Sequence, residues 1–142
     1  MEVAAALACI VIGITDGDTL TARCEMPEGK ANITVRVAEI DAPEKAQAFG
    51  NRSRQHLAAT CFHRPAIVRP RTTDRYGRTV ARVECDGVDA SAEQVRAGMA
   101  WVFDRYVTDR SLYPVQDEAR SEGRGLWSDS LATPPWEWRR QR

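Results

Sequence analysis

The sequence predicts an α+β domain in which a small five-stranded β-barrel is combined with three helices. Three observations lead to this fold class: there are five segments of strand character, a helical segment separates the third from the fourth, and two more helical segments follow the fifth. The composition, 43% hydrophobic and 28% charged, is ordinary for a globular protein. We therefore expect residues 1–142 to form one domain.

The first three strands are expected at residues 8–14, 18–24 and 32–40, where apolar and β-branched residues alternate with polar ones. Asp-Gly is a frequent pair in two-residue hairpin turns, so the first hairpin is expected to turn at Asp16 and Gly17. The turn-prone segment MPEGK then leads into the third strand.

A helix is expected over residues 50–62. Ser53, Leu57 and Cys61 recur at a spacing of four and therefore share one face of that helix. Strand character returns in the segments AIVRP and RTVARVEC, which are separated by the polar segment RTTDRYG.

The second helix is expected in the segment SAEQVRAGMA, which opens with a capping box. In that arrangement Ser91 accepts a hydrogen bond from the backbone N–H of Gln94, whose side chain reaches back.

The third helix is expected over residues 114–123. Pro114 suits a first helical turn, and Gly123 or Gly125 can end the helix. The remaining residues, from about 130 to 142, are rich in Pro, Trp and Arg and are expected to pack as an extended arm. This order of elements favours a barrel of the OB type.

The formal net charge is zero, so the composition provides no overall attraction to nucleic acid. Lys30 and Lys45 are the only lysines, and arginine supplies the other basic side chains. This bias reflects either the codon usage of a GC-rich genome or bidentate recognition of phosphate or carboxylate groups by some of the arginines. Composition does not separate these two explanations.

The four cysteines have no CxxC spacing, which argues against a zinc ribbon or a redox motif. If the first hairpin turns as predicted, residues whose numbers sum to 33 face each other, and Cys9 and Cys24 satisfy this condition. Cys61 is then left to pair with Cys85. Two disulfides would indicate an oxidising compartment, and hence a periplasmic or secreted protein, whereas four buried free thiols would fit a cytosolic one.

The N-terminal segment MEVAAALACIVIG is apolar, but it lacks a basic start and its apolar run is shorter than a membrane span. We interpret it as the beginning of the first strand, although ALAC faintly resembles a lipoprotein cleavage site. No membrane association is expected, and an export signal would have been removed already.

Asp18 opens an apolar strand, and aspartate is a poor strand former. The hairpin turn explains Asp16 and Gly17 without further function, but it gives no reason for Asp18. This carboxylate is therefore a candidate site residue.

The segment IDAPE places Asp41 and Glu44 on either side of a turn at Pro43. The residue before proline is held extended, so Ala42 can present its carbonyl outward. Two carboxylates and a carbonyl suit a hard cation such as Ca²⁺ or Mg²⁺, although an acidic surface turn is the plainer alternative. Arg36 lies five positions before Asp41, so the two can share a site only if the strand ends or bulges between them.

The segment DRYGR is either an ordinary turn or a second phosphate site, with Arg78 as the guanidinium and Tyr76 stacking on a base or ribose. Three carboxylates and two arginines together are the groups needed to cleave a phosphodiester. The cation neutralises the phosphate, a carboxylate accepts a proton from water, and the arginines stabilise charge that develops in the transition state.

The sequence resembles the staphylococcal nuclease (thermonuclease) family over nearly its whole length. The resemblance rests on five motifs in order: DGDTL, VRVAEIDAPE, TDRYGR, QVRAGMAWV and GLW. It implies an OB-type barrel with three helices and the Ca²⁺-dependent hydrolysis of DNA and RNA, leaving 3′-phosphate ends.

For the cofactor, the resemblance implies one Ca²⁺ ion, with Mg²⁺ less favoured. Asp18 and Asp41 match the family's calcium carboxylates, and Ala42 stands where the family's carbonyl ligand falls.

For the substrate, the resemblance implies that Arg36 and Arg78 bind phosphate and that Glu44 is the general base. Tyr76 and Tyr106 stand where the family's nucleotide-contacting tyrosines lie. The segment after Glu44, KAQAFG, is shorter than in the best-known member, and the neutral charge predicts weaker non-specific binding to polyanions.

The expected partner is therefore DNA or RNA, bound by a monomer with no obligate protein partner. Two alternatives remain open at this point. One is a non-catalytic binding module that holds nucleic acid or protein in the barrel groove. The other is a structural or inhibitor-like exported domain that makes contacts through its tryptophan-rich tail.

Overall fold

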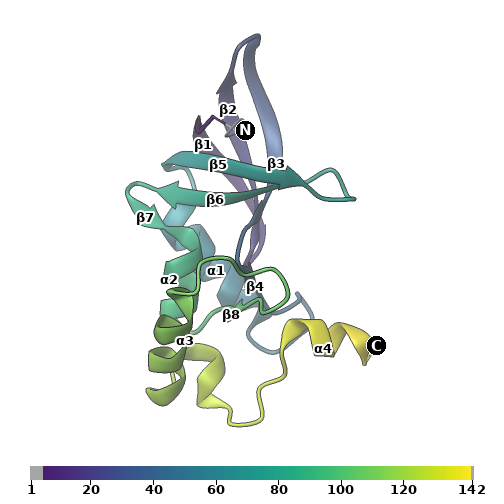
Figure 1. Cartoon of the computed structure of the whole chain (residues 1–142), viewed down its shortest axis with the longest axis vertical. Helices are drawn as coiled ribbons and strands as arrows, with labels where there is room; N and C mark the ends of the chain where they lie inside the picture. Colours follow the sequence, from purple (N-terminus) through teal and green to yellow (C-terminus); the bar gives the residue numbers. More distant parts are fainter. Residues whose placement is uncertain (1–4, 142) are drawn as a thin grey trace.

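The computed structural model describes residues 5–141. In chain order its elements are β1 (Leu7–Asp16), β2 (Thr19–Met26), β3 (Gly29–Val37), β4 (Ile40–Asp41), α1 (Gly50–Cys61), β5 (Pro65–Thr73), β6 (Thr79–Cys85), β7 (Val88–Asp89), α2 (Ala90–Arg96), β8 (Trp101–Val102), α3 (Leu112–Ser121), the 3₁₀ helix η1 (Gly125–Ser128) and α4 (Pro135–Arg140). Figure 1 shows the strands β1, β2, β3, β5 and β6 gathered at one end of the molecule, with α1, α2 and α3 grouped at the other.

The main sheet closes into a five-stranded barrel. Its strands lie in the order β3-β2-β1-β5-β6-β7, and an additional parallel pairing of β3 with β6 joins the two ends. The predicted α+β barrel fold is therefore confirmed, with β7, β4 and β8 as short additions. The β3–β6 pairing matters for function because it fixes the end of β3, where Arg36 lies opposite Val80.

The first hairpin differs from the prediction by one turn position. Asp16 pairs with Thr19, so that the turn residues are 17–18. Two bulges then insert one residue each into β1, and the register returns to the predicted pairing by the time Cys9 faces Cys24. The prediction of this pair was right, but the reason given was incomplete, because the turn and the bulges offset each other.

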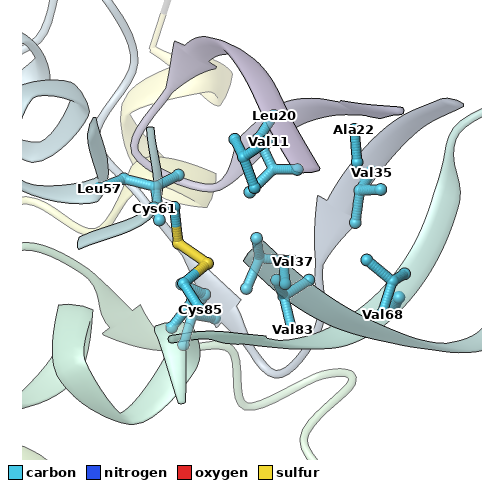
Figure 2. Packing of buried hydrophobic residues seen from close by; sticks show 14 of the residues in the cluster. Val11, Leu20, Ala22, Val35, Val37, Leu57, Cys61, Val68, Val83 and Cys85 are labelled. Atoms are coloured by element: carbon cyan, nitrogen blue, oxygen red, sulfur yellow. A yellow bond between two sulfur atoms is a disulfide. The ribbon is translucent and has the colours of Figure 1, made fainter. Parts of the chain in front are cut away.

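The barrel interior is filled by buried aliphatic side chains, and Figure 2 shows them meeting the helical layer at Leu57 and Cys61. Two disulfides are present in the predicted pairing. Cys9–Cys24 crosses the β1–β2 hairpin, and Cys61–Cys85 fastens the end of α1 to the end of β6. No cysteine among residues 5–141 is free.

Helix α1 buries the face expected from its sequence, which includes Leu57. The predicted capping box of the next helix is wrong. The side chain of Asp89 caps α2 by accepting from the N–H of Ala92, and Ser91 lies inside the helix, where its hydroxyl donates to the carbonyl of Ala38. The hydroxyl of Ser91 thus makes a tertiary hydrogen bond in place of the local capping bond that the sequence predicted.

The C-terminal region also differs from the prediction. Helix α3 ends as expected, with Gly123 in the left-handed region at φ 64° directly after the cap residue. The tail is not an extended arm throughout, because α4 forms a short helix that begins at Pro135 and ends at Arg140. Proline suits a first helical turn, and the basic residues at the end complement the helix dipole. Figure 1 shows α4 set apart from the α1–α3 group, at the end of an irregular connection.

Within residues 5–141, no helix is long and apolar enough to cross a membrane.

Candidate active site

Residues of α1 and α2 pack against the acidic turn at residues 17–18. The side chain of Gln94, itself buried, donates to the carbonyl of Gly17 at 2.8 Å and to that of Ser53 at 3.0 Å. A Cβ at position 17 would stand 1.8 Å from Ser53 Oγ and 2.8 Å from the Cβ of Ala42, so only glycine fits. The turn therefore presents Asp18 from a backbone that is packed tightly against two other segments.

The connection from β3 to β4 lies beside this turn. Strand β3 ends at Val37, and Glu39 takes a left-handed conformation at φ 82°, which interrupts the regular strand before β4 begins at Ile40. The guanidinium of Arg36 donates to the carbonyls of Val37 and Ile40 at 2.8 and 3.0 Å. The strand does end between Arg36 and Asp41, as their shared site required.

Arg36 joins the two predicted metal carboxylates. Its Nη2 atom lies 3.4 Å from Asp18 Oδ2 and 3.4 Å from Asp41 Oδ1, and all three side chains are largely buried. Asp18 Oδ2 also accepts a hydrogen bond of 2.7 Å from the backbone N–H of Ala42. Asp18 from the first hairpin turn and Asp41 from β4 thus converge on one guanidinium nitrogen of a β3 residue.

The carboxylates of this cluster affect one another's protonation. Burial and the neighbouring charge of Asp18 raise the pKa of Asp16 to about 7. Burial also opposes ionisation of Asp18, but the charge of Arg36 and hydrogen bonds from Asp16, Ala42 and Thr19 lower its pKa. Asp16, which the sequence analysis assigned to the hairpin turn alone, is therefore electrostatically part of the site.

The pKa of Asp41 is also shifted by burial and by its neighbours. Burial raises its pKa, and the nearby charge of Asp18 raises it further, while hydrogen bonds and charges from Arg139 and Arg36 act in the opposite direction. The net result is a raised pKa, as expected of a buried carboxylate whose cationic partners do not fully compensate it.

Glu44 lies at the edge of the same cluster, where its side chain is about one-third exposed. Its backbone N–H donates to Gln47 Oε1 at 3.1 Å, so the segment after Pro43 folds back on itself. The carboxylate contacts Arg139, whose Nη1 atom lies 2.6 Å from Glu44 Oε1.

Arg139 is a further site residue that sequence reasoning missed. It comes from α4, and its Nη2 atom lies 2.6 Å from Asp41 Oδ2. The contact spans 98 positions in the chain, and neither periodicity nor motif spacing relates the two residues. The only available signal was the basic, tryptophan-containing composition of the tail.

The remaining predicted residues are not gathered at this cluster. Arg78 Nε bonds to Asp74 Oδ2 at 2.8 Å, and its guanidinium lies over the ring of Tyr76, which is exposed. Tyr106 is also exposed and packs edge-on against Phe103. Arg78 and Tyr76 lie between β5 and β6, and Tyr106 lies between β8 and α3, so their predicted contacts with substrate stay predictions.

The cluster has some of the ligands that a divalent cation needs. Among residues 5–141, no three His, Cys, Asp or Glu side chains are arranged to hold a metal ion. Asp18 and Asp41 do converge on Arg36, and the raised pKa of Asp41 shows that its buried carboxylate is not fully compensated by the cations around it. Calcium accepts carbonyl and water oxygens as well as carboxylates, so these two residues fit it as a partial ligand set.

Comparison with known proteins finds one matching family and several similar proteins from bacteria. Residues 34–129 match the family described as staphylococcal nuclease homologue. A Haemophilus influenzae protein named uncharacterized endonuclease is 41% identical over 94% of this chain and 73% of its own length. A Shigella flexneri micrococcal nuclease is 40% identical over 92% and 79%, and the Escherichia coli protein ParB is 42% identical over 92% and 78%.

Proposed function

The chain belongs to the staphylococcal nuclease family, and on that basis we propose that it is a Ca²⁺-dependent nuclease whose site is built on Asp18, Arg36, Asp41 and Glu44. Phosphodiester hydrolysis in nucleic acids is the activity that the family and the nuclease names of its relatives support. The dependence on calcium, the 3′-phosphate products and the roles of individual residues are the finer parts of the proposal.

One observation supports the site most strongly. A single nitrogen of Arg36 lies 3.4 Å from both Asp18 and Asp41, although these residues come from three different segments. A structural ion pair needs one carboxylate for each guanidinium, whereas a site for a phosphate and a cation needs surplus negative charge beside an arginine. Arg36, with two carboxylates beside it, has the second arrangement.

Each residue has a part in the proposed reaction. Calcium, when bound between Asp18 and Asp41 with the Ala42 carbonyl as a further ligand, would neutralise the phosphate and help to position water. Glu44, at the exposed edge, accepts the proton of the attacking water. Arg36, fixed by two carbonyls and therefore preorganised, donates to the phosphate as negative charge develops on its oxygens.

Arg78 is proposed as the second phosphate-binding arginine. In the structure its guanidinium bonds to Asp74, at the base of the loop that also carries Tyr76. Only part of this side chain is exposed, so reaching the substrate requires exchange of the Asp74 contact for a phosphate oxygen. Tyr76 and Tyr106, both largely exposed, are proposed to stack on the bases or riboses of the bound strand.

The substrate is proposed to be DNA, RNA or both, bound by a monomer. We also propose that the protein is exported to the periplasm or beyond, because the two disulfides need an oxidising compartment to persist.

The proposal is tested by incubating the protein with single-stranded DNA, double-stranded DNA and RNA, in each case with Ca²⁺, with Mg²⁺ and with chelator. We expect cleavage that requires Ca²⁺ and stops with chelator, and 3′-phosphate ends in the products. Cleavage that persists with chelator would refute the cofactor assignment. Binding of oligonucleotide by a folded protein that cleaves none of the substrates would instead favour the non-catalytic module.

A further inference from the structure

Arg139 makes its contacts at the point where the proposed cation would act. Its Nη2 atom lies 2.6 Å from Asp41 Oδ2, and its Nη1 atom lies 3.3 Å from Asp41 Oδ1 and 2.6 Å from Glu44 Oε1. One guanidinium therefore spans the proposed metal ligand and the proposed general base. With Arg36 on Asp41 Oδ1, both oxygens of this buried carboxylate have cationic partners.

The helix that carries Arg139 is anchored by aromatic packing. The ring of Trp136 stacks on Phe103, with centroids 5.3 Å apart and planes 7° apart, and meets Trp101 edge-on at 5.8 Å. Trp101 pairs with Asp41 in the β4–β8 sheet, so the aromatic contact and the ion pair hold α4 to the same small sheet.

A second tether links the tail to the backbone of Glu44. Gln47 accepts from the N–H of Glu44 through Oε1 and donates through Nε2 to the carbonyl of Thr133 at 2.7 Å. The position of the segment before α4 is thus coupled to the segment that presents the proposed base. Displacing the tail would change the surroundings of Glu44 even apart from the loss of Arg139.

Arg139 resembles a bound metal ion in its positive charge and in its distance from Asp41. Its guanidinium pairs with both Asp41 and Glu44, so that one positive charge lies between two carboxylates. Calcium binds carboxylate oxygens at about 2.3–2.6 Å, the range in which Arg139 already stands from Asp41 Oδ2. A divalent cation and this guanidinium therefore cannot occupy the same side of Asp41 together.

We propose that α4 is an autoinhibitory strap, in which Arg139 holds Asp41 and Glu44 when calcium is absent and must leave them for calcium to bind. This inference rests on the proposed function, since it takes Asp41 as a calcium ligand. Calcium binding and docking of α4 then exclude each other, so the strap raises the calcium concentration at which the site is filled. Once released, the guanidinium and the basic end of α4 are free to meet the phosphate backbone of the substrate.

The first test measures calcium affinity by titration calorimetry for the wild type, Arg139→Gln and Arg140→Gln. Arg140 is the matched control, because it is the exposed neighbour on the same helix and carries the same charge. We expect Arg139→Gln to bind calcium about tenfold more tightly than Arg140→Gln. Equal affinities in the two variants would overturn the strap, while the calcium assignment would stand.

The second test follows hydrogen exchange of the amides in residues 136–141 with and without saturating calcium. In the wild type we expect calcium to speed their exchange, and in Arg139→Gln we expect fast exchange even without calcium. Unchanged protection of α4 on calcium binding would refute the proposal. If no variant binds calcium up to millimolar concentrations, the proposed cofactor fails first, and the competition fails with it.

Discussion

Glu39 provides a prediction of stability whose size follows from its contacts. Its side chain is fully buried and bonds to Arg71, while its two oxygens accept from the Thr108 hydroxyl at 2.6 Å and from the N–H groups of Thr108 and Asp109 at 2.9 and 2.8 Å. These bonds fasten the loop before α3 to the turn between β3 and β4. The same turn sets the positions of Arg36 and Asp41.

The magnitude comes from the pKa of this carboxyl. Burial alone would raise it, but the hydrogen bonds from Thr108, Arg71 and the backbone lower it from 4.5 to about 2. At about 1.4 kcal/mol per pKa unit, ionised Glu39 stabilises the fold by about 3 kcal/mol at neutral pH. Because the folded pKa is the lower one, this stabilisation is complete above pH 4.5 and is lost as the pH falls toward 2.

We therefore expect Glu39→Gln to lower the free energy of unfolding by about 3 kcal/mol at pH 7 and by progressively less below pH 4.5. Urea unfolding at pH 7, 5 and 3 measures the difference from the wild type, with Glu28→Gln as an exposed control that changes the same charge. A difference below about 0.5 kcal/mol at pH 7, the usual range for a surface substitution, would refute the reasoning. So would a difference that is equal at pH 7 and pH 3.

Three further predictions concern the packing and the cross-links of the fold. Gly17→Ala should cost about 1–3 kcal/mol in urea unfolding, because its Cβ has no room, and it should slow cleavage by moving the acidic turn. Gly13→Ala is its control, since a Cβ there meets nothing closer than 3.7 Å, and an equal cost would contradict the steric explanation. Replacing Cys9 and Cys24 together by Ser should lower the free energy of unfolding by about 3 kcal/mol. Reductant should then destabilise the variant less than the wild type, because this disulfide is no longer there to be reduced. Leu57→Ala should cost about 2–5 kcal/mol by opening a cavity beneath the barrel, and a loss under 1 kcal/mol in thermal or urea unfolding would show that the core collapses around it.

Local sequence patterns were sufficient to predict the barrel. The alternation of apolar residues located its strands, and the turn at Pro43 correctly required the strand to end between Arg36 and Asp41. The pairing of Cys9 with Cys24 was predicted correctly from a turn placed one position too early, because the two bulges in β1 offset that error. The bulges themselves could not be predicted, because a bulge depends on cross-strand packing rather than on the residues it inserts.

The parts of the site that could not be predicted depend on contacts between distant segments. Gln94 has the sequence signature of a helix cap, yet its side chain supports the turn at Gly17, 77 positions away. Arg139 reaches Asp41 through a six-residue helix that is too short for a periodic signal. In both cases a long-range polar contact outweighs the local preference, and no spacing in the chain reveals it.

The proposed site is tested most directly by the rates of nucleic acid cleavage of Arg36→Ala and Glu44→Gln at saturating calcium, with circular dichroism to establish that both remain folded. Loss of a general base or of an arginine that stabilises the transition state typically costs about 10²–10⁴-fold and 10³–10⁵-fold in rate, respectively. We predict losses of at least 100-fold in each folded variant. Wild-type rates in either variant would contradict the assignment of the site.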